Sequence, residues 1–211
     1  MMTLNETASL AIRPATPEDA ELAARLMYLS MGELAEYLFG GVRASVDEIL
    51  AGLFRLKESR FSWCRADVAE WAGQPVGMTI SFSGRETLRR NLVTGAGLLK
   101  ICGLRDVIHL AVRALSIAAG IESKRDEYYL ANMAVLPEYQ GRGIGSGLLT
   151  HVEEKAREAG SQKCSLIVDT ENPNARRLYE RFGYQIVFTK TYLGSAEDAH
   201  AGYHRMVKEL V

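Results

Sequence analysis

A glycine-rich segment constrains this chain more than any other feature. Residues 137–147 read Pro-Glu-Tyr-Gln-Gly-Arg-Gly-Ile-Gly-Ser-Gly, directly after a strand-like run and at the start of an amphipathic helix. Glycines permit positive φ angles and close approach to a ligand, and a helix start offers unpaired N–H groups at its positive dipole end. The segment therefore predicts an anion site suited to phosphate. Arg142 adds a guanidinium group that fits phosphate oxygens.

The glycine spacing argues against two well-known nucleotide-binding motifs. A P-loop requires G-x-x-x-x-G-K followed by Ser or Thr, and no lysine follows these glycines. The dinucleotide motif G-x-G-x-x-G also fails, because its last position falls on Ser146 or on Leu148. The segment is thus predicted to bind a different phosphate compound.

Two motifs in this chain resemble one family. Gln140-x-x-Gly143-x-Gly145 is similar to the Q/R-x-x-G-x-G/A signature of the GNAT superfamily of acyl-CoA-dependent N-acyltransferases. Residues 172–184, Asn-Pro-Asn-Ala-Arg-Arg-Leu-Tyr-Glu-Arg-Phe-Gly-Tyr, resemble a second family motif, N-x-x-A-x-x-L-Y-E-x-x-G-F/Y. The two motifs stand in the family's order and spacing, so the resemblance is specific.

The order of strand-like and helical runs predicts an α/β fold. Strands alternate with helices after residue 127, which requires at least one parallel strand pair, and a hairpin signal at 72–74 implies antiparallel neighbours. The resemblance, carried by residues 127–190, implies a GNAT-type mixed, mostly antiparallel sheet with a central splayed parallel pair flanked by helices, in a single domain of residues 1–211. The expected strands are 9–13, 61–71, 75–83, 127–136, 163–169, 184–191 and 202–210, and the expected helices are 16–31, 46–57, 143–159 and 173–182.

The resemblance assigns a role to each motif residue. Met133 and Val135 would offer backbone groups to the pantetheine arm of acetyl-CoA, and Asn172 would hold that arm or cap the next helix. Tyr179 would lie beside the thioester sulfur and act as the general acid, since a phenol can donate a proton to a departing thiolate. The backbone N–H groups expected to bind the pyrophosphate belong to Gln140, Gly141, Arg142, Gly143, Ile144 and Gly145.

The general base is not fixed by the sequence. An alkylamine has a pKa of about 10.4 and is mostly protonated at neutral pH, so a base or a water relay is required. Relatives that acetylate histones or ribosomal proteins carry a glutamate at the positions of Tyr129 or Ile167, and neither glutamate is present. The remaining candidates are Glu127, Asp169, Glu171 and His204.

These residues lead to a functional expectation. The chain would transfer an acetyl group from acetyl-CoA to a primary amine of a small molecule or peptide, by direct attack in a ternary complex. No cysteine lies on either motif, which argues against an acyl-enzyme intermediate. The alternative is a non-catalytic acyl-CoA sensor or interaction module of the same fold, a possibility raised by the missing glutamates.

Composition narrows the partners and the compartment. The 25 basic and 26 acidic residues give a net charge of −1, so no global basic field would attract nucleic acid. Cys64, Cys102 and Cys164 are isolated, which predicts neither a zinc site nor a disulfide framework, and no metal is expected. No signal peptide and no membrane span are predicted, and a cytoplasmic location is expected.

Residues 85–121 form an insertion relative to the common family pattern. Their apolar positions step by three and four, which predicts helix. We expect this segment to cover or border the acceptor groove, with its Arg105, His109 and Arg113 stripe either solvated or lining an acceptor channel. The apolar helices of residues 92–119 could instead form a partner or membrane-surface interface, or the seam of a homodimer. Tyr37 and Phe39, between the first two expected helices, either pack in the core or line the acceptor pocket.

Overall fold

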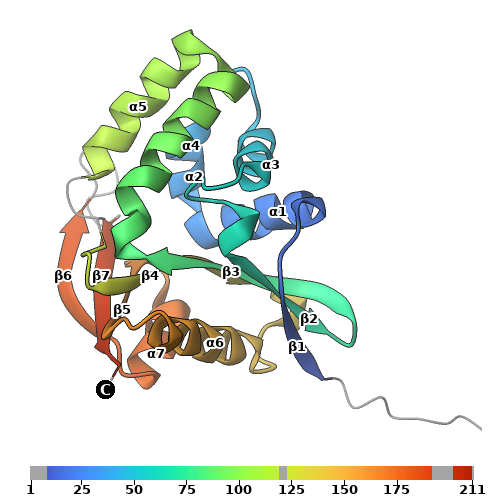
Figure 1. Cartoon of the computed structure of the whole chain (residues 1–211), viewed down its shortest axis with the longest axis vertical. Helices are drawn as coiled ribbons and strands as arrows, with labels where there is room; N and C mark the ends of the chain where they lie inside the picture. Colours follow the sequence, from blue (N-terminus) through green and yellow to red (C-terminus); the bar gives the residue numbers. More distant parts are fainter. Residues whose placement is uncertain (1–8, 119–122, 192–201, 211) are drawn as a thin grey trace, which may run out of the picture.

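A computed structural model describes residues 9–118, 123–191 and 202–210 of the protein (Figure 1). Its centre is a seven-stranded sheet in the order β1-β2-β3-β4-β5-β7-β6. Only β4 and β5 are parallel among the described strands, so the predicted mixed, mostly antiparallel sheet is confirmed. The strands are β1 (Leu10–Pro14), β2 (Ala66–Trp71), β3 (Gln74–Ser83), β4 (Glu127–Val135), β5 (Lys163–Asp169), β6 (Gln185–Thr191) and β7 (Gly202–Glu209).

Helices cover both faces of the sheet. Helices α1 to α5 lie on one side of it, and α6 and α7 lie on the other (Figure 1). The helices are α1 (Ala20–Met31), α2 (Glu33–Phe39), α3 (Val46–Arg55), α4 (Thr87–Cys102), α5 (Leu104–Ala118), α6 (Ile144–Glu158) and α7 (Pro173–Arg181).

Local signals explain several helix boundaries. Ser45 begins α3 as an N-cap and accepts a hydrogen bond from the Glu48 N–H at 3.2 Å, while the Glu48 carboxylate accepts one from the Ser45 N–H at 2.8 Å. Gly160 follows α6 with a φ of 68°, and Gly183 follows α7 with a φ of 89°, a conformation that favours glycine. The predicted ends of these helices are therefore confirmed.

The parallel pair separates at its middle. Strands β4 and β5 are paired only from Glu127 and Lys163 to Leu130 and Leu166. Beyond that point β4 remains paired with β3, and β5 remains paired with β7. A register shift between Ile80 and Ser81 marks a bulge in the β3–β4 ladder. This separation opens the sheet in the manner that the resemblance implied.

The core has two main parts, one on each side of the sheet. Apolar side chains of α1, α2 and α3 pack on β2 and β3, and a second cluster joins β4, β5, β7, α6 and α7. Phe39 belongs to the first cluster and is 5% exposed, with its ring 6.0 Å from that of Phe61, so the core alternative holds for Phe39. Tyr37 is 45% exposed and does not pack in the core.

Three expectations about the chain before residue 127 need correction. The strand expected from Phe61 begins only at Ala66, because Trp63–Arg65 forms a 3-10 turn capped by the Ser62 hydroxyl. The segment 32–41 contains the helix α2, which the sequence analysis did not predict. Gly103, at a φ of 82°, divides the inserted segment into α4 and α5, and residues 119–121 of the insertion lie outside the described residues.

Candidate active site

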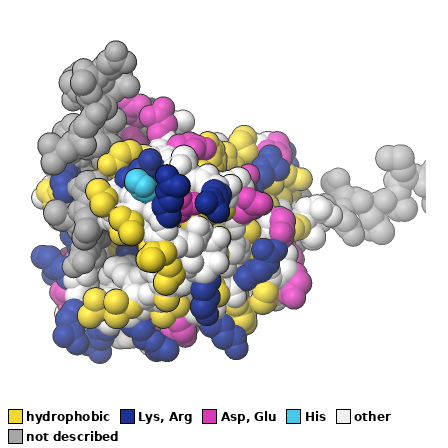
Figure 2. Space-filling view, turned by 90° about the horizontal axis from the view of Figure 1, so that it is seen from above, with side chains coloured by type: hydrophobic (Ala, Val, Ile, Leu, Met, Phe, Trp, Pro, Cys, Tyr) yellow, Lys and Arg dark blue, Asp and Glu magenta, His cyan; other side chains and the backbone are white. Residues whose placement is uncertain are grey.

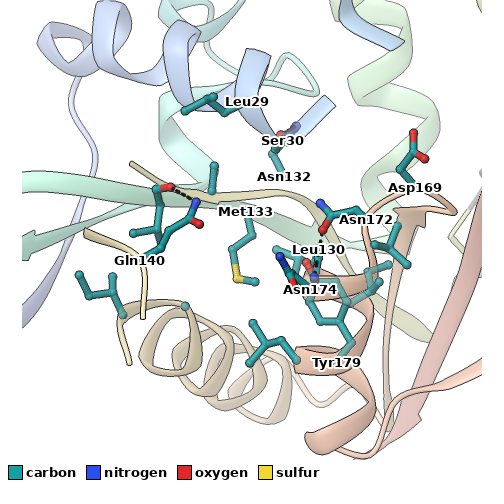
Figure 3. Close-up of a pocket in the computed structure, with 18 of the residues that line it drawn as sticks. Leu29, Ser30, Leu130, Asn132, Met133, Gln140, Asp169, Asn172, Asn174 and Tyr179 are labelled. Atoms are coloured by element: carbon teal, nitrogen blue, oxygen red, sulfur yellow. Dashed lines mark hydrogen bonds between the residues drawn. The ribbon is translucent and has the colours of Figure 1, made fainter. Parts of the chain in front are cut away.

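A cavity of about 550 Å³ lies where β4 and β5 separate. Its walls come from β4, β5, the 139–146 segment and α7, together with the end of α1 and the start of α2 (Figure 3). The cavity therefore has one half beside α6 and α7 and another beside α1 and α2. We call these the α6–α7 half and the α1–α2 half.

The start of α6 forms one wall of the α6–α7 half. Gly141 and Gly143 have φ angles of 75° and 82°, and a Cβ atom at either position would meet no atom within 4 Å. Glycine is therefore required here by the backbone conformation and not by lack of space. Residues 143–146 at the start of α6 line the cavity. No described side chain caps this N-terminus, so its first N–H groups have no side-chain acceptor among the described residues.

Gln140 connects this segment to the open strand. Its Nε2 donates a hydrogen bond to the Val135 carbonyl oxygen at 3.0 Å (Figure 3). This bond fixes the distance between the end of β4 and the turn that precedes α6. Gln140, Gly141, Gly143, Ile144 and Gly145 all line the cavity.

Arg142 is the exception in this segment. Its guanidinium lies over the Tyr139 ring at 5.2 Å and donates to the Glu138 carbonyl oxygen at 3.2 Å. Arg142 is not among the lining residues. The Arg142 side chain, which was predicted to contact phosphate, thus packs on the preceding turn. Only the backbone of Arg142 remains part of the glycine-rich segment.

The exposed end of β4 supplies a second wall. Met133 and Val135 both line the cavity, and Figure 3 shows the Met133 side chain between Gln140 and Asn174. Asn132, 7% exposed, donates from its Nδ2 to the Ser30 hydroxyl of α1 at 2.8 Å. The buried Asn132 Oδ1 has no hydrogen-bond partner among the described residues. Sequence reasoning missed Asn132, because no motif includes it.

The N-terminus of α7 begins at the same opening. Asn172 caps this helix through its Oδ1, which accepts a hydrogen bond from the Ala175 N–H at 3.0 Å, so the predicted capping role is confirmed. Asn172 also lines the cavity beside Asn174.

Tyr179 lies about two helical turns after the Asn172 cap and lines the cavity. It is 6% exposed, and its ring packs edge to face on Tyr184 with a centroid distance of 5.9 Å. Burial raises the pKa of Tyr179 well above its ordinary value of 10, because a phenolate loses hydration there. No described residue forms a hydrogen bond with its hydroxyl, which therefore remains a protonated donor.

The structure separates the four candidate bases. Asp169, at the end of β5, lines the cavity, and its Oδ1 accepts a hydrogen bond from the Glu171 N–H at 2.8 Å. Glu127 lies outside the cavity and forms a buried ion pair with Arg205. His204 also lies outside it, with Nδ1 2.7 Å from the Thr189 hydroxyl, and Glu171 is exposed. Asp169 is the one carboxylate among the described residues that line the cavity.

Two further positions are those where some relatives carry a glutamate. Ile167 lines the cavity two residues before Asp169, so the alternation of a strand places both side chains on the same face of β5. Tyr129 is buried against Phe82, with ring centroids 5.8 Å apart.

The α1–α2 half consists mainly of apolar side chains: Leu29, Met31 and Leu34, with Ser30 between them. Helix α5 supports this wall from behind. Arg113 donates to the Gly40 carbonyl oxygen at 2.5 Å, and the Arg43 N–H donates to Asp106 at 3.3 Å. No described residue of α4 or α5 lines the cavity itself.

The described residues lack two features that other kinds of site would need. They contain no group of three or more His, Cys, Asp or Glu residues that could hold a metal ion. None of their helices combines the length and the apolar character that crossing a membrane requires.

Comparison with known proteins agrees with the fold and the motifs. The model of the family described as Acetyltransferase (GNAT) matches residues 31–184, more than half of the chain. This protein therefore belongs to the GNAT acetyltransferase family.

Individual curated relatives match a smaller part of the chain than the family model does. A Bacillus subtilis (strain 168) protein provisionally named a ribosomal protein bS18 alanine N-acetyltransferase is 33% identical over 82 residues, which are 38% of this chain and 54% of that protein. The chain thus spans about half the length of this curated relative.

Solved structures extend the likeness to nearly the whole chain. A crystal structure described only as an acetyltransferase has 27% identity and a TM-score of 0.69, covering 95% of this chain and 100% of its own. An N-acetyltransferase from Staphylococcus aureus Mu50 has 23% identity and a TM-score of 0.72, covering 94% and 100%, and this second likeness concerns the fold alone.

Proposed function

We propose that this protein transfers the acetyl group of acetyl-CoA to a primary amine by direct attack in a ternary complex. The observation that carries the proposal is one cavity that joins an uncapped helix start, an open strand edge and a protonated buried phenol. The first suits a diphosphate, the second an extended amide-containing arm, and the third a thiolate leaving group.

The donor would lie in the α6–α7 half. The N–H groups of residues 140–145 would bind the pyrophosphate, with the backbone of Met133 and Val135 along the pantetheine arm. Arg142 would contribute through its N–H, because its side chain is held by Tyr139 and Glu138.

The acceptor would enter through the α1–α2 half. Asp169 would take one proton from the ammonium group, which frees the nitrogen lone pair to form the C–N bond. Negative charge then develops on the carbonyl oxygen, where a fixed β4 amide such as that of Val135 can stabilise it. The C–S bond breaks, and the Tyr179 hydroxyl donates its proton to the thiolate sulfur. The nitrogen of the new amide releases its second proton to solvent, and solvent carries the proton of Asp169 back to Tyr179.

A panel of amines with thiol release as the readout tests this proposal. It should include alkylamines, arylalkylamines and a peptide with an N-terminal alanine, the last because of the name of the Bacillus subtilis relative. At least one amine should give turnover, with initial-rate lines that intersect when both substrates are varied. Parallel lines would contradict direct attack.

Calorimetry with acetyl-CoA, combined with the amine panel, distinguishes an enzyme from a non-catalytic acyl-CoA sensor. Binding without turnover across the panel would favour an acyl-CoA sensor over an enzyme. Absence of binding would overturn the donor site itself.

A further inference from the structure

The outward face of the α4–α5 hairpin carries apolar side chains that do not pack in the protein's core. Six of the twelve exposed large apolar side chains in the described residues lie on these two helices, each between 45% and 73% exposed. They recur at helical spacing, so that they share the outward side of each helix. They are Leu88, Leu92 and Leu99 on α4, and Leu104, Ile108 and Val112 on α5.

The fold does not need these side chains for its own core. Leu98, Ile101 and Cys102 of α4 already pack against the α1–α3 core, and Leu110 of α5 is 2% exposed. Single exposed apolar residues are ordinary, but a run of them along two adjacent helices marks an interaction surface.

The same face carries positive charge. Helices α4 and α5 contain five basic residues and one acidic residue. Arg89 and Arg90 form ion pairs with acidic residues, Arg90 being buried, and Arg113 donates to the Gly40 carbonyl oxygen. The charge of the outward face is therefore that of Lys100 and Arg105. Lys100 and Arg105 are exposed beside Leu99 and Leu104, and neither forms an ion pair within the described residues. The one acidic residue, Asp106, accepts a hydrogen bond from the Arg43 N–H.

This face lies at the end of the molecule farthest from α6 and α7 (Figure 1). Figure 2, which looks down on this end, shows a row of hydrophobic side chains beside Lys and Arg side chains and a histidine. Apolar side chains with basic flanks are the pattern of helices that lie in a lipid headgroup region.

We propose that the α4–α5 hairpin binds the surface of an anionic bilayer. Its leucine, isoleucine and valine side chains would enter the headgroup boundary, while Lys100 and Arg105 meet lipid phosphates. A second copy of the chain fits less well. In a two-fold dimer the same patch of both copies forms the interface. Lys100 and Arg105 of one copy would then lie close to the same basic residues of the other, which is unfavourable.

Vesicle sedimentation with the full chain tests the proposal. Vesicles of equimolar phosphatidylcholine and phosphatidylglycerol should bind the protein, and pure phosphatidylcholine should bind it far more weakly. Salt at about 0.5 M should weaken the binding, because it screens the charges. The double variant Lys100→Gln, Arg105→Gln should lose roughly thirtyfold in affinity, since each basic residue near such a surface contributes about fivefold.

The contribution of the apolar side chains to vesicle binding is tested separately. The variant Leu104→Ser, Ile108→Ser should abolish sedimentation with vesicles and leave the thermal unfolding midpoint unchanged, because both side chains are exposed. Matched controls are Val187→Ser, an exposed apolar residue of β6, and Arg25→Gln, Arg157→Gln, which remove the same charge from α1 and α6. These should bind vesicles like the wild type.

Two results would overturn the proposal. One is failure of the wild-type protein to sediment with either vesicle. The other is a wild-type dimer in sedimentation velocity that Leu104→Ser, Ile108→Ser converts to a monomer, which would identify the face as a seam between copies.

Discussion

The two halves of the cavity are built in different ways. The α6–α7 half uses the end of β4, the residues 139–146 that follow it, and side chains of the single helix α7. The α1–α2 half uses side chains from α1, α2 and the end of β5, and it is supported by α5 through Arg113 and Asp106. The first half comes from two short segments that the sequence motifs mark, whereas the second brings together segments that lie far apart in the chain.

This difference has a functional meaning under the proposed reaction. A donor common to a whole family can be bound by backbone groups that few side-chain changes affect. An acceptor that differs between members needs a wall of replaceable side chains, such as Leu29, Met31 and Leu34. Substitutions in the two halves should therefore change different kinetic constants.

The largest effect is expected at Tyr179. Tyr179→Phe should lower kcat by at least about a hundredfold, the usual scale for loss of a general acid. Affinity for acetyl-CoA in calorimetry should not change. Because burial raises the pKa of Tyr179 above 10, the wild-type rate should not fall as the pH approaches about 10, where an ordinary tyrosine would ionise.

Tyr128→Phe is the matched control, since Tyr128 is also a buried tyrosine but does not line the cavity. Its kcat should stay within about twofold of the wild type, far from the hundredfold scale of a lost acid. Equal losses in the two variants would remove the proposed role of Tyr179.

Asp169→Asn should have the next largest effect, lowering kcat/KM for the amine by about thirtyfold at neutral pH. The loss should shrink as the pH rises toward about 10.4, because more of the amine is then unprotonated without help. Glu171→Gln and His204→Gln serve as controls, as both residues lie outside the cavity. A pH-independent loss would mean that Asp169 positions the acceptor and takes no proton.

Much of the α6–α7 half could be predicted from the sequence, for a physical reason. A strand, a turn with positive φ angles and a helix start follow one another within about a dozen residues, so spacing alone fixes their geometry. The cap at Asn172 and the position of Tyr179 on α7 follow from the same local logic.

The other half could not be predicted, because its contacts join distant segments. Four residues were equal candidates for the base, and only the sheet pairing places Asp169 at the opening and Glu127 in a buried ion pair. The contact of Arg113 with Gly40 crosses 73 residues. The Arg142 side chain was predicted to meet phosphate on charge alone, and its contact with the Tyr139 ring is a tertiary detail.

A matched glycine pair tests the backbone character of the α6–α7 half. Gly143 precedes α6 and Gly160 follows it, both with positive φ and with no atom within 4 Å of an added Cβ. Alanine at either position should therefore cost about 1–2 kcal/mol of stability from backbone strain alone. Only Gly143→Ala should also weaken acetyl-CoA binding, by about tenfold or 1.4 kcal/mol. Equal donor affinities in the two variants would show that the start of α6 is not the phosphate site.

The smallest effect concerns the support behind the α1–α2 half. Arg113→Ala removes the hydrogen bond to the Gly40 carbonyl oxygen, which ends α2, and Leu34 of α2 lines the cavity. The wall should loosen, so the KM for the amine should rise by about threefold to fivefold, roughly the worth of one hydrogen bond. The kcat and the affinity for acetyl-CoA should stay unchanged, and Arg113→Lys should restore part of the loss. Arg105→Ala, an exposed site on the same helix, is the control. An Arg113→Ala variant that weakens acetyl-CoA binding as much as amine binding would mean that the two halves respond as one unit.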